Sequence, residues 1–312
     1  MLKFILKRLM YLPLILLIVS FVVFAILRLS PVDAAFSYLV QSQIPPTEEA
    51  LQNARIELGL DKPFLQQYVT WLKNALVLDF GISYVTKRDV LTDLLYYLPT
   101  TLILTLLSML LLIGLSIIVG ILAALKKDSL FDKGVLLFSF AGVSIPSFWF
   151  GFLLILFFSL QLGVLSPFNE LSASSYILPI ITLSLMSLCI NVRLMRASFL
   201  AHLKARFVPY AKARGLSDGK IARTHILKNS LIPVSTSLGT HFGELLGGAV
   251  VVELLFALPG LGRYTISAIY SHDYPVVQCF VLLMSLIFIL VNLCIDILYV
   301  FLNPQIAYEG QE

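Results

Sequence analysis

Long uncharged segments alternate with short polar segments along most of the chain. These uncharged or nearly uncharged segments occupy residues 9–27, 98–125, 134–162, 176–192, 230–252, which includes Glu244, and 276–295. Each of them approaches or exceeds the roughly 20 residues that an α-helix needs to cross a bilayer. The pattern therefore predicts an all-α, polytopic membrane protein with six transmembrane helices.

The composition supports this prediction, since 59% of the 312 residues are hydrophobic and only 13% are charged. A soluble globular protein has more charged residues and fewer apolar ones. The first uncharged segment follows Lys3, Lys7 and Arg8 and so resembles a secretory signal peptide. Because the segment is longer than an ordinary signal-peptide core and more helices follow it, we expect an uncleaved first helix.

The basic residues indicate how the helices are oriented, because short cytoplasmic loops carry an excess of Lys and Arg. With the N-terminus in the cytoplasm, 15 of the 22 Lys and Arg residues fall on the cytoplasmic side. The other seven fall on the opposite side, five of them in one long segment. We therefore expect both termini to be cytoplasmic.

Residues 31–97 form the one long segment with a soluble composition, and this orientation places it outside the membrane. Its apolar residues recur at helical spacing, at Leu65, Tyr68, Val69, Leu72 and Leu76. Thr47 stands where it can cap a helix that starts at Glu48. We expect several short helices here, which either dock a partner or order the first two transmembrane helices. The chain thus divides into an N-terminal helix (1–30), this insert (31–97) and a transmembrane core (98–308).

The longest predicted cytoplasmic loop, at about residues 201–229, is basic. It includes most of the sequence PYAKARGLSDGKIARTHILKNSLIP (209–233), in which Gly215 breaks an Ala-rich helical start. Ser217 and Asp218 then stand where N-capping residues begin a second helix. The sequence predicts two short helices at an angle, projecting from the membrane.

Four segments together resemble a known family. They are MLKFILKRLMYLPLILLIVSFVVFAILRL at the start, LGLDKPFLQQYVTWLKNALVLDFGISY in the insert, SIPSFWFG, and ELLFALPGLGRYTISAIYSHDYPVVQ. These segments are similar to the dipeptide/oligopeptide/nickel family of ABC-importer permeases, and the resemblance extends over essentially the whole chain. Within that family, SQIPPTEE, HFGELLGG and DYPVVQCF resemble the nickel-importer permeases most and the peptide permeases less.

The resemblance implies a permease subunit of an ATP-driven importer, with no catalytic activity and no cofactor of its own. Its expected partners in the cell inner membrane are a second homologous permease, two cytoplasmic ATPases that bind ATP, an extracytoplasmic solute-binding protein and lipid, but no nucleic acid. The expected cargo is nickel, free or chelated, with dipeptides or oligopeptides as the alternative.

The basic loop resembles the coupling loop of this family, which contacts the ATPase. The residues that the resemblance assigns to this contact are Tyr210, Ala211, Ala213, Arg214, Gly215 and Leu216. The family's loop motif reads Glu-Ala-Ala, three residues, Gly, and only Ala211 and Gly215 match it here.

His241 and Glu244 are the candidate residues of the translocation pathway. They stand three residues apart on one face of the fifth predicted helix, at a depth where ionisable groups are costly and normally line a cavity. Imidazole and carboxylate groups are also reasonable ligands for a divalent ion such as Ni²⁺, so both residues are candidate metal ligands. The alternative is that they only form hydrogen bonds between helices or with a partner.

No motif for catalysis is visible in the sequence. The fragment nearest to a P-loop, residues 215–221, has the wrong spacing and lacks a Ser or Thr after Lys220. Neither a GxSxG nor an HExxH pattern occurs. A membrane-embedded enzyme is therefore disfavoured, and the loop that resembles an ATPase contact disfavours an autonomous ion channel.

Overall fold

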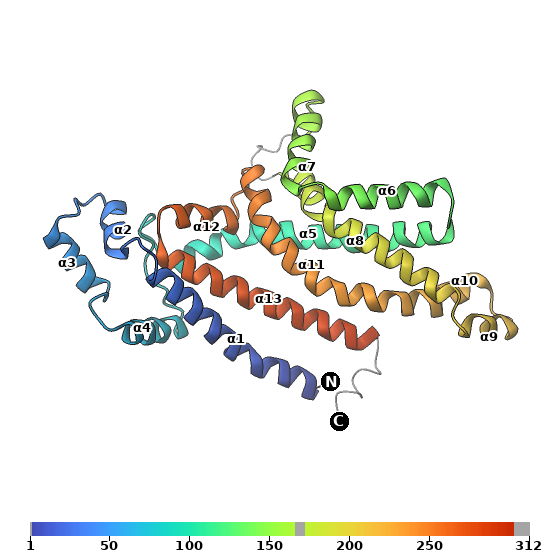
Figure 1. Cartoon of the computed structure of the whole chain (residues 1–312), viewed down its shortest axis with the longest axis horizontal. Helices are drawn as coiled ribbons and strands as arrows, with labels where there is room; N and C mark the ends of the chain where they lie inside the picture. Colours follow the sequence, from blue (N-terminus) through green and yellow to red (C-terminus); the bar gives the residue numbers. More distant parts are fainter. Residues whose placement is uncertain (1, 166–171, 303–312) are drawn as a thin grey trace. The chain divides into compact units, whose positions relative to one another are not determined.

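The computed structural model describes residues 2–165 and 172–302, and most of these lie in helices (Figure 1). The chain forms two compact units. Unit 1 comprises Met1–Ile5, Leu102–Leu258 and Val291–Glu312, and unit 2 comprises Leu6–Thr101 and Pro259–Leu290. Residues 303–308 of the predicted core lie outside the described residues.

Each unit takes its helices from separate stretches of the chain. Unit 2 contains most of α1 (Leu2–Arg28), the first parts of α5 (Val90–Leu125) and α13 (Tyr274–Leu302), and α2 (Ala34–Gln41), α3 (Glu48–Glu57), α4 (Phe64–Leu76) and α12 (Leu261–Tyr270). Unit 1 contains the rest of α5 and α13, with α6 (Leu130–Ser144), α7 (Ser147–Leu154), α8 (Ile177–Leu203), α9 (Phe207–Ala213), α10 (Asp218–Ile221) and α11 (Leu227–Leu255). A π-helical turn, Ile155–Gln161, extends α7. Another, Ala222–Ile226, joins α10 to α11.

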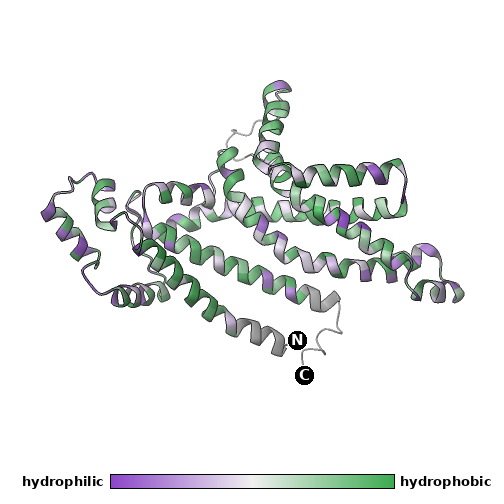
Figure 2. Cartoon of the chain, viewed as in Figure 1, coloured by the Kyte–Doolittle hydropathy of each residue, from purple (hydrophilic) through white to green (hydrophobic). Residues whose placement is uncertain are grey.

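Within the described residues, five helical stretches are long and apolar enough to cross a membrane. They are Met10–Arg28, Val90–Leu125, Ser174–Leu203, Asp218–Leu255 and Tyr274–Ile297. Figure 2 shows that α1 and α13 are mostly apolar, whereas hydrophilic residues gather on α3 and around α9. The all-α membrane fold is thereby confirmed, and the predicted six spans are reached if α6 and α7 together count as one.

The third predicted helix is not continuous. Its two parts, Leu130–Ser144 and Ser147–Gln161, are bent by 108° relative to each other. Ile145 is extended, with φ −88° and ψ 124°, because the ring of Pro146 disfavours a helical conformation in the residue before it. Pro146 then stands at the N-cap of α7. The prediction of one helix over 134–162 is therefore wrong.

The insert folds into the short helices that its sequence predicts, α2, α3 and α4. Thr47 Oγ1 accepts a hydrogen bond from the Ala50 N–H at 3.3 Å, which confirms the predicted cap of α3. Tyr68 of α4 is buried, with its hydroxyl 2.8 Å from Ser20 Oγ and its ring 5.4 Å from that of Phe24. These contacts fix α4 against α1 within unit 2.

The loop after α8 forms a hairpin in which α9 is one of the two predicted short helices. The other, α10, is not separate, because it is the first turn of a helical stretch that continues to Leu255. Gly215 has φ +77°, a left-handed conformation that ends α9 and that other residues rarely adopt. Ser217 occupies the N-cap position of α10, but its side chain makes no capping hydrogen bond. The Asp218 carboxylate instead forms an ion pair with the Lys212 ammonium, 2.8 Å away. The prediction that these two side chains cap α10 is therefore wrong.

The central helix of unit 1 is α8, which packs against α6, α7 and α11. Helices in a membrane approach closely where small residues face the neighbour. A Cβ atom at Gly120 of α5 would lie 2.7 Å from the Cβ of Met195, and one at Gly142 of α6 would collide with Cys189 Sγ. Glycine at these positions therefore allows α5 and α6 to pack close to α8.

Candidate functional site

From Pro233 onward, the exposed residues of α11 form one stripe, which carries polar side chains at Thr236, Thr240 and Glu244. They recur every three or four residues, which is the spacing of one helical face. From the N-terminal end, they are Pro233, Thr236, Thr240, Glu244, Gly247, Val251 and Leu254. No large apolar side chain occurs in this series before Val251. We call Thr236, Thr240 and Glu244 the α11 stripe.

The exposed face of α5 has the opposite character. From Leu102 onward its exposed residues are Ile103, Leu106, Leu107, Leu110, Gly114, Leu115, Ile118, Leu122 and Leu125. A face in contact with lipid tails is apolar, because hydroxyl and carboxylate groups lose their hydrogen bonds with water in hydrocarbon. The Thr236 hydroxyl is satisfied within its own helix, since it donates to the Ile232 carbonyl at 3.0 Å, but the exposed Glu244 carboxylate is not. The α11 stripe therefore faces water or another protein at Glu244 rather than lipid.

The two candidate pathway residues contact each other on α11. Nδ1 of His241 lies 2.7 Å from Oε2 of Glu244, which is the contact that three-residue spacing on a helix permits. The Ser187 hydroxyl of α8 donates to the same oxygen at 2.9 Å. The His241 side chain is 4% exposed, whereas that of Glu244 is 43% exposed. The imidazole thus supports, from within unit 1, a carboxylate that reaches the surface.

The hydrogen bonds also indicate which nitrogen of His241 carries a proton. Nε2 is buried and has no hydrogen-bond partner among the described residues. A proton on Nε2 would leave an unpaired N–H buried, whereas a proton on Nδ1 is donated to Glu244. The neutral ring with its proton on Nδ1 fits this arrangement, so the pair carries the single negative charge of Glu244.

A metal site at His241 and Glu244 stays a prediction. In the part of the chain that the structure describes, no group of three or more His, Cys, Asp or Glu residues is placed to hold an ion. Any metal bound by His241 and Glu244 would need its remaining ligands from water or from a partner.

The predicted ATPase-contact residues lie together on the α9–α10 hairpin, well away from this pair. Tyr210 is 74% exposed, and Ala213, Arg214 and Gly215 are also exposed, whereas Ala211 is buried. Leu216 is half-buried and packs on the core that joins the hairpin to α8. From the start of α11 to His241 the helix rises about 20 Å. The structure therefore separates two sets of candidate residues along the same unit.

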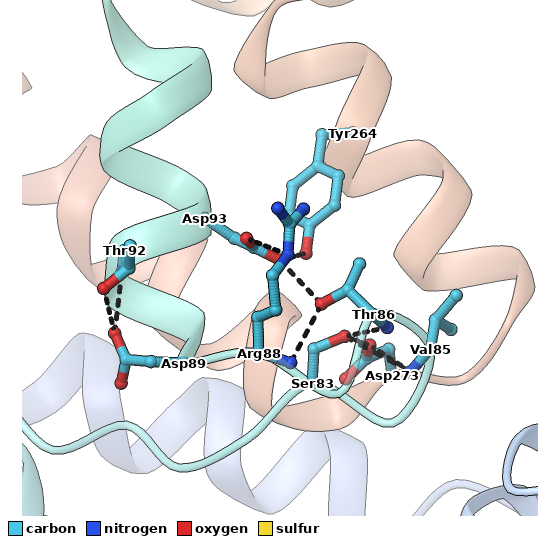
Figure 3. Close-up of polar contacts among 9 residues, drawn as sticks. All are labelled: Ser83, Val85, Thr86, Arg88, Asp89, Thr92, Asp93, Tyr264 and Asp273. Atoms are coloured by element: carbon cyan, nitrogen blue, oxygen red, sulfur yellow. Dashed lines mark hydrogen bonds and ion pairs between the residues drawn. The ribbon is translucent and has the colours of Figure 1, made fainter.

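A second polar cluster lies in unit 2, where the sequence indicated no site (Figure 3). Asp93 of α5, which is buried, accepts hydrogen bonds from the hydroxyls of Thr86 at 2.6 Å and Tyr264 at 3.0 Å. It also pairs with Arg88 at 3.0 Å. Burial raises the pKa of the Tyr264 hydroxyl, and its hydrogen bond to Asp93 adds to the rise. The cluster ties α12 to the start of α5.

Asp273 forms the other half of this cluster. Its Oδ2 accepts hydrogen bonds from the Ser83 hydroxyl at 2.5 Å and from the Val85 N–H at 3.3 Å. Burial raises the pKa of the Asp273 carboxyl, and the Ser83 hydrogen bond opposes the rise because it stabilises the charged form. These contacts hold the segment before α5 against the turn that precedes α13.

Replacing Ser83 with alanine should destabilise the protein more at high pH than at low pH. A buried acid with a raised pKa favours the folded state when it is protonated. Its stabilising contribution is therefore complete below the unfolded-state pKa, about 4, and is lost as the pH rises through the folded-state value. Without the Ser83 hydroxyl the pKa of Asp273 rises further, which costs about 2 kcal/mol once the carboxyl is ionised.

Thermal unfolding of the purified Ser83→Ala variant should therefore show a larger loss of stability at pH 8 than at pH 5. Ser267→Ala, at an exposed position of α12, serves as the matched control and should behave as the wild type does at both pH values. Equal losses at the two pH values would mean that the Ser83 hydroxyl does not stabilise the ionised form of Asp273.

Comparison with known proteins identifies the family. A model described as "Binding-protein-dependent transport system inner membrane component" matches residues 116–308, and a model for the N-terminal part of such components matches residues 1–105. The glutathione transport system permease protein GsiC of Escherichia coli (strain K12) is 38% identical over 310 residues, which cover 99% of this chain and 100% of the relative. The di/tripeptide transport system permease protein DppB of Pseudomonas aeruginosa (strain UCBPP-PA14) is 36% identical, with the same coverage.

These relatives do not support the expected closeness to nickel permeases. Both match over essentially their full length and neither is named for a metal, whereas the resemblance to nickel permeases depends on three short segments. Membership of the family implies that the protein works in a complex with an ATPase and a binding protein. The chain belongs to the inner-membrane components of binding-protein-dependent transport systems, which are the permease subunits of ABC importers.

Proposed function

We propose that this permease imports short peptides, of the size of dipeptides, tripeptides or glutathione. The observation that carries the proposal is the full-length similarity to two permeases named for such cargo, at 38% and 36% identity. The alternative cargo, nickel, has the support only of the segments SQIPPTEE, HFGELLGG and DYPVVQCF.

The α11 stripe forms one wall of the proposed translocation pathway. Its hydroxyl and carboxylate groups would be costly against lipid but are solvated in a water-filled path. His241 supports Glu244 from behind, so both residues belong to the pathway in this proposal. A second, homologous permease forms the opposite wall, and an extracytoplasmic binding protein delivers the peptide.

The α9–α10 hairpin is the proposed contact with the ATPases, which bind ATP. The distribution of Lys and Arg supports a cytoplasmic N-terminus, which places the hairpin on the same side as the ATPases. Tyr210 projects from the hairpin with 74% of its surface exposed, while Ala211 anchors the hairpin to its own unit. Movement of the ATPases can therefore reach α8 and α11 through this hairpin.

An uptake assay with the complete complex in proteoliposomes tests the proposal. The complex of both permeases, both ATPases and the binding protein should take up a radiolabelled dipeptide, tripeptide or glutathione only when ATP and the binding protein are both present. Labelled Ni²⁺ should not enter without a peptide. Uptake of Ni²⁺ together with no uptake of any of these peptides would refute the proposal and restore nickel as the cargo.

The Tyr210→Ala complex provides a matched test of the coupling hairpin in the same assay. Because Tyr210 is largely exposed, the variant should fold as the wild type does, yet its peptide uptake should fall about tenfold or more. Tyr210→Phe keeps the ring and should retain most of the uptake.

A further inference from the structure

We propose that Glu244 is a cation site of the pathway that receives the ammonium group of the peptide cargo. This inference rests on the proposed function, since it assigns a role to one residue of the proposed pathway. It depends on three features: an open carboxylate oxygen, a negative charge that no basic side chain neutralises, and hydroxyl groups spaced along the same face.

The two oxygens of the Glu244 carboxylate differ in how many hydrogen bonds they form. Oε2 is occupied twice, by the His241 ring at 2.7 Å and by the Ser187 hydroxyl at 2.9 Å. Oε1 has no hydrogen-bond partner among the described residues and belongs to a side chain that is 43% exposed. The two contacts fix the carboxylate, and Oε1 is left as an acceptor at the surface of the stripe.

The negative charge of Glu244 lacks a counter-charge within this chain. In the described part of the chain, no Lys or Arg lies within ion-pair distance of it, and its one charged-type neighbour is His241, whose Nδ1–H form is neutral. A carboxylate at membrane depth is costly unless a cation pairs with it. A cation that arrives in the pathway is therefore attracted to Oε1.

The chemistry of the stripe favours an ammonium group over a metal ion. A divalent ion such as Ni²⁺ needs several strong ligands at once, whereas the stripe offers one open carboxylate oxygen and hydroxyl groups. An ammonium group donates three hydrogen bonds, which Glu244 Oε1 and the hydroxyl of Thr240, one turn away, can accept. Every peptide with a free N-terminus carries such a group.

The length of the stripe also suits a short peptide. Thr236 and Glu244 are eight residues apart, which corresponds to about 12 Å along the helix. An extended tripeptide spans about 10 Å. A peptide whose ammonium group lies at Glu244 can extend along Thr240 to Thr236. The Thr236 hydroxyl donates to the Ile232 carbonyl at 3.0 Å and can still accept a hydrogen bond from a peptide N–H.

Cysteine accessibility tests the charge and the water access of the site together. Thr240→Cys is introduced beside Glu244 in a Cys294→Ser background, which leaves only the buried Cys189 and Cys279 as native thiols. The complete complex is treated with two methanethiosulfonate reagents, one carrying a trimethylammonium group and one carrying a sulfonate. Rates are normalised to those with a free thiol. Leu110→Cys, on the exposed apolar face of α5, is the lipid-facing control.

We expect the cationic reagent to modify Thr240→Cys about tenfold faster than the anionic reagent, because a carboxylate one turn away attracts one and repels the other. The preference should fall to within about twofold when Glu244→Gln is added, and Glu244→Asp should restore it. The Leu110→Cys control should react with neither reagent. Absence of reaction at Thr240→Cys, or a preference that is unchanged by Glu244→Gln, would overturn the inference.

A protection experiment then tests the ammonium group itself. An excess of a dipeptide with a free N-terminus should slow modification of Thr240→Cys at least threefold, and its N-acetylated form should not, provided that Glu244 is intact. Equal protection by the two peptides would also overturn the inference. If the proposed function alone fails, no peptide is taken up although the charge preference remains. If this inference alone fails, peptide uptake persists without the preference or the selective protection.

Discussion

Replacing Asp132 with alanine should lower the stability of the protein by about 3 kcal/mol, because the change leaves a partly buried guanidinium without its partner. Arg196 of α8 donates two parallel hydrogen bonds to Asp132 of α6, from Nε at 2.5 Å and from Nη2 at 2.6 Å. The side chain of Asp132 is 2% exposed and that of Arg196 is 17% exposed. Such a paired geometry is the strongest form of an Arg–carboxylate contact.

Asp132 has a second role at the start of α6, and alanine would remove the part of it that the carboxylate plays, while keeping the backbone N–H. Its Oδ2 accepts a hydrogen bond from the Asp128 N–H at 2.9 Å, and its own N–H donates to Ser129 Oγ at 3.2 Å. These contacts satisfy backbone groups at the start of α6 that have no partner within the helix. One carboxylate therefore closes the N-terminal end of α6 and attaches that end to α8.

The stability loss can be measured by thermal unfolding of the purified protein in detergent. Asp218→Ala is a matched control, because Asp218 also pairs with a basic residue, Lys212, but its side chain is 80% exposed. An exposed pair is worth at most about 1 kcal/mol. If both variants lost the same stability, burial of the Asp132–Arg196 pair would not be the source of the effect.

The second large effect is expected for Gly120→Val, which should cost about 2 to 3 kcal/mol. A Cβ at this position would lie 2.7 Å from Met195 Cβ and 3.0 Å from the carbonyl oxygen of Val192. Met195 is fully buried, and a backbone carbonyl inside a helix cannot move without bending it. The valine therefore forces α5 away from α8.

Gly114→Val, on the same helix, separates this collision from the effect of losing a glycine. A Cβ at Gly114 meets no atom within 4 Å, so the added side chain points into open space. Valine also has a higher helix propensity than glycine, which favours the variant by a few tenths of a kcal/mol. Unfolding temperatures should fall for Gly120→Val and stay equal or rise for Gly114→Val. A similar fall in both would contradict close packing as the cause.

Local features of the fold were predictable where neighbouring residues decide them. The apolar segments predicted the spans, and Thr47 predicted the start of α3, because capping depends on residues three positions apart. A kink at Pro146 was predictable, because proline disfavours a helical conformation in the residue before it, but the 108° bend was not, since both of its sides are equally apolar. The sequence also did not predict that α5 begins at Val90, before the uncharged segment 98–125. Asp93 looks like the end of a polar segment in the sequence, but in the fold Thr86, Arg88 and Tyr264 pair with it.

The candidate site shows the same limit. The contact between His241 and Glu244 was predictable, because two ionisable groups in an apolar segment stand out and their spacing puts them on one face. Ser187 was not, since it is 57 residues from Glu244 and reaches it only through the packing of α8 on α11. Thr236 and Thr240 became informative only once their exposure was known, because uncharged hydroxyls are common inside transmembrane helices.

The local resemblance to nickel permeases has a structural explanation for one of its three segments. The segment HFGELLGG, which suggested it, includes residues that serve helix packing: a Cβ at Gly248 would lie 3.0 Å from Leu183 of α8. Phe242 and Leu245 of the same segment are buried within unit 1. Similarity over such a segment reflects the packing of α11. Permeases with different cargo can share this packing.

The polar face of α11 also has a consequence for how the protein is made. A helix that carries a carboxylate near its centre enters the bilayer less readily than a uniformly apolar helix, by about 2 to 3 kcal/mol on insertion scales. The groups that satisfy Glu244 include Ser187 of α8, which precedes α11 in the chain. During synthesis we therefore expect α11 to insert most readily while α8 is still beside it at the translocon.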